Sequence, residues 1–351
     1  MTTVVTVFFP LDEALHLGEH SWSPATLSKA LRLGVEIASY RRAAALFSDL
    51  TQLSLSKSTL QRLTTTYGQV VEQVLDAEAE AMVQIPKQEE AITWRSIPEP
   101  DSPMMNVSSD GVMICLLKEG WKEVKTVAIS AVESTLDEET GEIEVRLTQH
   151  SYRAGLWEAP TFATHLWAES CRRGLEKAKH VVSVNDGAVW GPRGTPAIVF
   201  LCFARCTQIL DWWHAVQRLW TIAAVAFGED RPAATVWVEQ QKRLLAQSQL
   251  RQVLRNIRRL FPRTQPLPEP VRKAVGYFGH NRWRMYYREF RAAGCPIGSG
   301  TVESACKVVV QQRMKQAGMR WRRSHAQAML ALRSALLSDR WTLIDNALNP
   351  G

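Results

Sequence analysis

The sequence predicts a mixed α/β protein in which blocks of helix flank a five-stranded mixed sheet. Apolar residues recur at three-to-four spacing from about Ser23 to Met82 and again over 215–297, as in amphipathic helices. Between these blocks lie short runs rich in β-branched residues, bounded by glycine and by acidic turns. With 351 residues, 46% of them apolar and 22% charged, the chain is long enough for two or three globular domains.

The first block, residues 1–85, is expected to be helical and to contain a helix-turn-helix-like unit at about 38–68. A helix over YRRAAALFSDLT is followed by a short turn, and a second helix begins at a cap formed by Ser56 or Ser58. Such a unit can present side chains to DNA, although plain helix packing explains the same pattern. The candidate DNA contacts of this unit are Arg41, Arg42, Lys57 and Arg62.

Residues 86–103 contain four prolines and are expected to form a linker. Three β-rich runs follow, MMNVSSDGVMICLL, VKTVAISAVES and IEVRLTQHSYRAGL, and they suggest an antiparallel meander. An amphipathic helix, a buried strand HVVSVNDG and a further strand leading into DWWH come next. This is the opening order of an RNase H-like fold, so residues 104–214 are expected to form the first part of such a core.

Residues 215–297 are expected to form an all-helical insertion, after which 298–340 return to the core and 341–351 form a tail. The segment from Arg251 to Arg340 holds 19 Lys and Arg against 4 Asp and Glu, a net charge of +15 in a chain of total +7. Such one-sided charge suits a polyphosphate partner, although a solvated helix surface would also produce it. The candidate phosphate and base contacts are Arg313, Lys315, Arg320, Trp321, Arg322 and Arg323, of which the tryptophan either stacks on a base or packs inside.

Three carboxylates are candidates for a metal-dependent active site. Asp110 lies on the first predicted strand, Asp186 ends the strand VVSVND, and Glu303 lies in the first turn of the helix after Gly298-Ser299-Gly300. Two Mg²⁺ ions held by converging carboxylates activate the attacking oxygen and stabilise the leaving oxygen of a phosphodiester. Each acid also has a structural explanation, because Asp-Gly favours turns and a glutamate at N3 of a helix capped by Gly300 stabilises the helix start.

The run GCPIGSGTVESACKVVVQQRMKQAGMRW, with ALRSALLSDRW after it, resembles the C-terminal signature of bacterial insertion-sequence transposases of the ISKra type. SSDGVMI, GWKEVK, NDGAVW and ILDWWH match further blocks of that family in the expected order, and FPLDEALHL resembles its N-terminal region. Relatives of this kind carry a longer N-terminal part, often with cysteine pairs. Only MTTVVTVFF precedes PLDEAL here, so we expect an N-terminally short copy.

The resemblance implies a DDE transposase that cleaves transposon ends and joins them to target DNA. It assigns the catalytic and metal-binding acids to Asp110, Asp186 and Glu303, with two Mg²⁺ ions or Mn²⁺ as a substitute. ILDWWH is similar to a C/D-x-x-H motif of Mutator-like and related transposases, which makes Asp211 and His214 auxiliary residues. The implied partners are terminal inverted repeats, target DNA and further copies of the chain on paired ends. Two alternatives stay open: a non-catalytic DNA-binding protein and an RNase H-like nuclease or resolvase.

The location predicted from the sequence is the cytoplasm, in association with the nucleoid. No stretch approaches eighteen uncharged apolar residues, so no membrane span is expected. The N-terminus lacks the basic region and the cleavage site of a signal peptide. The six cysteines are scattered and are expected to be reduced thiols.

Overall fold

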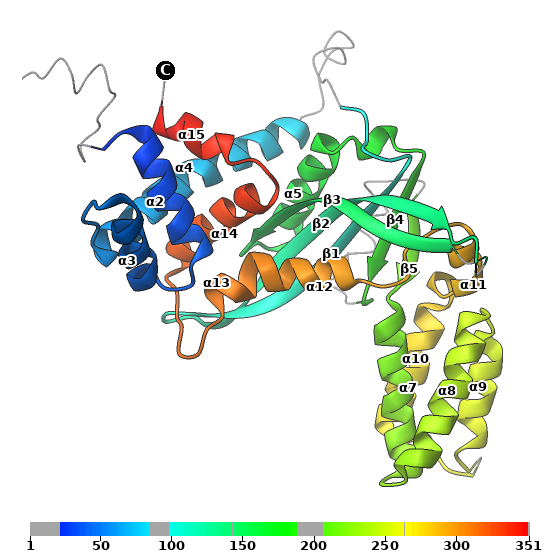
Figure 1. Ribbon diagram of the computed structural model, residues 1–351. Helices are drawn as coiled ribbons and strands as arrows, with labels where there is room; N and C mark the ends of the chain where they lie inside the picture. The colour runs from blue at the N-terminus through cyan, green and yellow to red at the C-terminus, as the bar shows by residue number, and fades with distance from the viewer. Residues whose placement is uncertain are drawn as a thin grey trace, which may run out of the picture.

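A five-stranded mixed sheet forms the centre of the protein, with helices at both ends (Figure 1). The structure is a computed structural model. The sheet has the order β3-β2-β1-β4-β5, in which β1, β2 and β3 are antiparallel neighbours and β4 and β5 run parallel to β1. The predicted mixed α/β class with a five-stranded mixed sheet is therefore confirmed. The structure describes residues 22–83, 98–139, 141, 143–187, 206–262 and 264–349.

Among the described residues, three helices precede the sheet, and the side chains of Ser23, Ser39 and Ser56 cap their starts. They are α2 (Pro24–Glu36), α3 (Tyr40–Thr51) and α4 (Lys57–Val83). The Ser39 hydroxyl accepts a hydrogen bond from the Arg42 N–H, and the Ser56 hydroxyl accepts one from the Thr59 N–H at 3.0 Å. Ser56 is thus the cap of the second helix of the predicted unit. Most of the predicted linker, 86–103, lies outside the described residues.

The strands alternate their side chains between two helical layers. They are β1 (Met104–Leu116), β2 (Gly120–Leu136), β3 (Ile143–Gly155), β4 (His180–Asn185) and β5 (Cys206–Leu210). On β1, Met105 and Val107 pack with Phe162 of α5 (Ala159–Arg172). Val112 and Ile114, of opposite parity, join a cluster with the C-terminal helices. Both faces of β1 are therefore covered.

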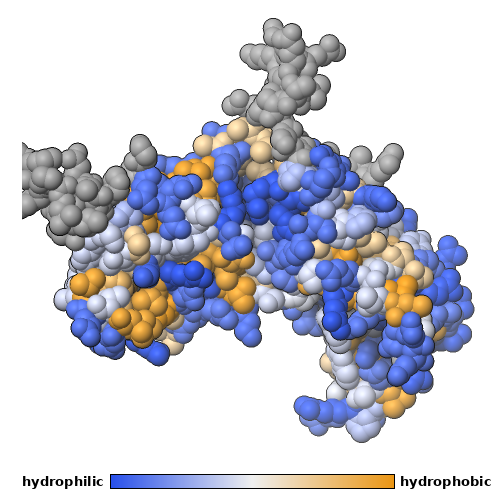
Figure 2. Space-filling view, turned by 45° about the horizontal axis from the view of Figure 1, so that its top comes forward, coloured by the Kyte–Doolittle hydropathy of each residue, from blue (hydrophilic) through white to orange (hydrophobic). Residues whose placement is uncertain are grey.

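The predicted helical insertion is present as an arm at the β5 edge of the sheet (Figure 1). It comprises α7 (Trp212–Phe227), α8 (Arg231–Ala246), α9 (Leu250–Arg259), α10 (Glu269–His280) and α11 (Tyr287–Ala292). The arm shares its core with the ends of β4 and β5, because Tyr287 donates to the Leu210 carbonyl and Arg284 donates to the Asn185 and Ile209 carbonyls. Figure 2 shows the arm projecting beyond a concave region of a largely hydrophilic surface.

The chain then returns across the sheet and finishes beside the N-terminal helices. It forms α12 (Gly300–Ala305), a π-helical segment (Cys306–Gln311), α13 (Gln312–Met314), α14 (Arg323–Leu337) and α15 (Thr342–Leu348). The expected tail at 341–351 is wrong, since α15 buries Ile344 and Leu348 in one core with Leu27 and Leu31 of α2. The N-terminal helices are therefore packed into the same body as the C-terminal segment. Among the described helices, none is long and apolar enough to cross a membrane.

Candidate active site

Asp110 lies on β1, and Asp186 directly follows the end of the neighbouring parallel strand β4. The β1–β4 register pairs Met104 with His180, and the same offset carried along the strands sets Asp110 opposite Asp186. The Asn185 side chain bridges the strands at this level, because its Oδ1 accepts a hydrogen bond of 2.8 Å from the Ser109 N–H. The parallel pairing therefore brings together two acids that are 76 residues apart in the sequence.

Asp110 faces the helical segment that carries Glu303. It has the parity of Val112 and Ile114, which pack in one core with Cys306 of the π-helical segment. Cys306 therefore lies on the same side of β1 as Asp110. Burial raises the pKa of Asp110, and the negative charge of Asp186 raises it further. Burial and, to a smaller extent, the neighbouring Asp186 charge thus both act against the charged form of Asp110.

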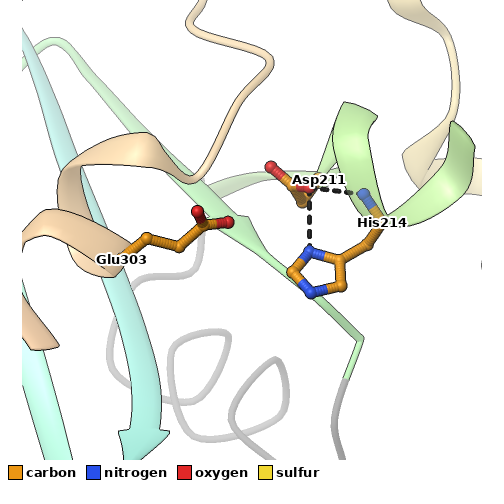
Figure 3. Close-up of side chains that lie close together, drawn as sticks. All are labelled: Asp211, His214 and Glu303. Carbon is orange, nitrogen blue, oxygen red and sulfur yellow. Dashed lines mark hydrogen bonds and ion pairs between the residues drawn. The ribbon is translucent and has the colours of Figure 1, made fainter. Parts of the chain in front are cut away.

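Asp211 connects the start of α7 to the loop before Glu303 (Figure 3). This fully buried side chain caps α7: its Oδ1 accepts from the His214 N–H at 2.7 Å and from the His214 ring Nδ1 at 2.9 Å. Its Oδ2 accepts from the Ser299 N–H at 2.5 Å, and the Ser299 hydroxyl donates to Glu303 Oε1 at 3.0 Å. One chain of hydrogen bonds therefore positions both His214 and Glu303.

Four of the five predicted site residues line or support one open cavity of about 530 Å³. Asp110, His214 and Glu303 line it, and Asp211 supports the last two from behind. The hydrogen bond to Asp211 raises the pKa of His214, and the charges of Asp186 and Glu303 raise it further. Asp186, the fifth predicted residue, therefore interacts electrostatically with His214 and Asp110.

The arrangement favours carboxylate ligation of a hard cation over a site centred on Asp211. One ligand atom from each of Asp211, His214 and Glu303 lies within 4.8 Å of the others. However, both oxygens of Asp211 already accept hydrogen bonds in a buried position, so using it as a ligand would break the capping interactions. The Asp110 and Glu303 carboxylates, which line the cavity, are therefore better placed as ligands than Asp211, which positions His214 and Glu303.

The helix start before Glu303 differs from the predicted one. Ser299, not Gly300, is the cap of α12, and Glu303 therefore lies one position beyond the predicted N3 position. Its carboxylate accepts from the Ser299 side chain and is exposed toward the cavity. The sequence reasoning missed Asn185, Ser299 and Cys306 as supporting residues. Each of them is close in the sequence to one of the acids, and this closeness could have identified them as candidates. Only the fold shows which of them make contact.

A basic cleft of about 820 Å³ lies at the opposite end of β1 from the arm. It is bounded by the N-terminal ends of α3 and α4 and by the segment before α14. Leu117, which directly follows β1, reaches this cleft, whereas Asp110 lines the carboxylate cavity. Seven residues of strand span roughly 24 Å, so the two regions are separated by about that distance. Seven predicted DNA contacts border the cleft: Arg41, Lys57, Arg62, Arg313, Arg320, Trp321 and Arg322.

Two of these seven residues are almost completely buried in the wall of the cleft, which leaves five exposed cations. Arg313 is 1% exposed, and its guanidinium donates to the Gly34 and Ala38 carbonyls, so its assignment to phosphate is wrong. Trp321 is 7% exposed and donates through its ring N–H to the Met314 carbonyl, so it packs and does not stack on a base.

The remaining three predicted contacts are exposed but lie outside the residues that line the cleft. Arg42 is on the surface of α3, and Lys315 lies 6.0 Å above the Trp121 ring. Arg323 pairs with Glu119 at 2.6 Å, which occupies its guanidinium. The structure therefore concentrates the predicted contacts into one smaller basic surface.

No protein-family model matches this sequence, and no curated protein matches it. The function of this protein is therefore inferred from its residues and from their arrangement.

Proposed function

We propose that this protein is a DDE-type DNA transposase with an RNase H-like core. The observation that carries the proposal is that acids from three elements lie close together. Asp110 of β1 and Glu303 of α12 line one cavity, and the charge of Asp186, at the end of β4, raises the pKa of both Asp110 and His214. The sheet order β3-β2-β1-β4-β5, with only β2 antiparallel to β1, supports the same proposal. A helical arm stands between β5 and the final acid, where the family resemblance implies an insertion.

Asp110, Asp186 and Glu303 are the residues that would hold Mg²⁺, with Mn²⁺ as a substitute. The bound ions would supply a Lewis acid that lowers the pKa of water and stabilises charge on a leaving oxygen. Asp211 fixes His214 and, through Ser299, the carboxylate of Glu303. In the reaction, water attacks the phosphodiester at the transposon end and leaves a 3′-OH and a 5′-phosphate. The 3′-OH then attacks a target phosphodiester and displaces the 3′-oxygen of the target strand.

The basic cleft is the proposed contact for the transposon end. Its cations come from the two helices of the proposed helix-turn-helix and from the segment that follows Glu303. Five cationic side chains on one concave surface suit the phosphates of a duplex. Terminal inverted repeats and target DNA are thus the proposed partners, with paired ends held by more than one copy of the chain. The proposed location is the cytoplasm, at the nucleoid.

The test is Mg²⁺-dependent cleavage and strand transfer on DNA that flanks the gene for this chain. The wild-type protein should nick the end and join a pre-cut end to a plasmid. Asp110→Asn, Asp186→Asn and Glu303→Gln should each abolish both products. Glu269→Gln is the matched control, because this exposed acid of α10 pairs with Lys273 away from the cavity.

The outcomes distinguish the transposase from the two alternative functions. Cleavage that survives Asp110→Asn at the wild-type rate would show that the carboxylates have been assigned wrongly. Cleavage without joined products indicates a nuclease or resolvase. Tight DNA binding without cleavage in Mg²⁺ or Mn²⁺ indicates a non-catalytic DNA-binding protein. Either of these last two results overturns the transposase proposal.

A further inference from the structure

One face of α7 carries two exposed tryptophans that the packing of the arm does not use. Trp213 is 62% exposed and Trp220 is 42% exposed. The buried side of the helix consists of other residues, among them Ala215, Leu219 and Ile222. A helix on the surface of a folded domain normally places polar residues on its outer face. These two large aromatic side chains therefore have no role in holding the arm together.

This aromatic face is continuous with the carboxylate cavity. Trp213, Gln217 and Trp220 follow the spacing i, i+4, i+7, so they lie on one side of α7. All three line the cavity that Asp110, His214 and Glu303 also line. At 1.5 Å per residue, the two tryptophans are separated by about 10 Å along the helix, the length of roughly three stacked bases.

Trp213 is fixed close to the candidate chemistry. It lies between Asp211 and His214 in the first turn of α7, and both of these neighbours are held by hydrogen bonds. The ring lies beside Gly298, where an added Cβ would be in ordinary van der Waals contact with indole Cδ1 and Nε1, at 3.8 Å. The ring also borders a second cavity of about 750 Å³ on the β3 side of the Gly298-Ser299-Gly300 loop. Trp213 thus stands where the two cavities meet.

We propose that Trp213 and Trp220 stack on unpaired bases of the DNA strand held at the carboxylates. A base presents its ring face only when it has left the duplex, and indole stacks on any base irrespective of sequence. Lys242 of α8 lines the same cavity and places a cation beside the aromatic face, where it also pairs with Glu239 at 2.7 Å. Exposed tryptophans, a lysine and three ionisable catalytic groups in one cavity suit a nucleic-acid strand better than an apolar protein surface. This inference rests on the proposed function and defines its substrate as DNA that is locally unpaired next to the scissile phosphate.

The binding test needs no cleavage, so it is done in EDTA. The probes are a fluorescent duplex ending in about eight unpaired thymidines and the fully paired duplex of equal length, with fluorescence anisotropy as the readout. The wild-type protein should prefer the forked probe. Trp213→Ala with Trp220→Ala should lower affinity for the forked probe by about 5- to 150-fold and leave affinity for the paired probe unchanged. Trp283→Ala is the matched control, because this tryptophan is 51% exposed but does not line the cavity.

A forked-probe affinity that the double variant retains would overturn the inference, and so would an equal loss of affinity for both probes. Trp213→Phe should retain most of the preference, since a smaller ring still stacks. Failure here is distinguishable from failure of the proposed function. Mg²⁺-dependent cleavage with no forked preference rejects only the stacking surface, whereas forked preference without cleavage rejects only the transposase activity.

Discussion

Arg313→Met should destabilise the protein without acting directly on DNA binding. The last carbonyls of α2 have no partners within that helix, and its last turn contains no basic residue. Arg313 supplies one of the missing donors, since its Nε donates to Gly34 O at 3.1 Å, and its Nη1 donates at 3.0 Å to Ala38 O just beyond the helix. The guanidinium also lies 4.4 Å from the centre of the Tyr40 ring. A residue 279 positions away along the chain thus caps α2.

The magnitude follows from these two hydrogen bonds. A bond from a charged donor contributes about 1.5–3 kcal/mol, and a buried carbonyl left without a donor costs about 1–3 kcal/mol. Methionine retains much of the side-chain volume, and the variant no longer buries a charge, which offsets part of the loss. We expect the free energy of unfolding to fall by about 3 kcal/mol. Arg313→Lys should lower the free energy of unfolding by a similar amount, because a single ammonium group cannot reach both carbonyls as the guanidinium does.

Urea unfolding followed by circular dichroism measures this change, and anisotropy with duplex DNA measures affinity below the unfolding transition. Arg322→Ala is the paired comparison, since Arg322 is exposed and lines the basic cleft. The reasoning is refuted if Arg313→Met unfolds within about 0.5 kcal/mol of the wild type and loses DNA affinity as Arg322→Ala does. That pattern would mean that Arg313 contacts phosphate.

Three further predictions concern the cleft, the site and acid stability. Arg322→Ala should weaken duplex binding uniformly across sequences and reduce the slope of log affinity against log salt by about 1, measured by anisotropy at several salt concentrations; an unchanged slope would exclude a phosphate contact. Asp211→Asn should return the pKa of His214 toward its ordinary value, which NMR titration measures, and should cut cleavage at least about tenfold. The reason is that an amide cannot accept from both the His214 and the Ser299 donors, so an unshifted pKa would contradict the hydrogen-bond chain. Burial beside Arg153 lowers the pKa of His165 to about 3, below its unfolded value, so its contribution to stability is present above about pH 6.5 and is lost as the pH falls toward 3. The wild type should lose up to about 2 kcal/mol between pH 7.5 and pH 5, and His165→Gln should lose less in the same urea experiment; equal losses would exclude His165 as the cause.

The sequence by itself determined the elements and the local contacts. The period of the apolar residues separated the helical blocks from the strands, and Ser56 was one of two serines predicted to cap a helix. The resemblance had put Asp211 and His214 in one motif, and the structure contains a hydrogen bond between them. These signals work because each depends on residues within one or two helical turns or along one strand. The three acids were also singled out from their positions at a strand, a strand end and a helix start.

Only the tertiary structure decided what each side chain faces. Two arginines of the same basic segment differ in burial: Arg313 is buried and caps α2, whereas Arg322 is exposed in an open cleft. The expected tail became α15 because Ile344 and Leu348 meet an apolar face of α2 that is distant in the sequence. Trp212 and Trp213 are neighbours in the sequence, yet Trp212 is buried whereas Trp213 is exposed and lines the carboxylate cavity. Burial depends on the elements that pack against a residue, and contacts hundreds of positions apart leave no periodic signal in the local sequence.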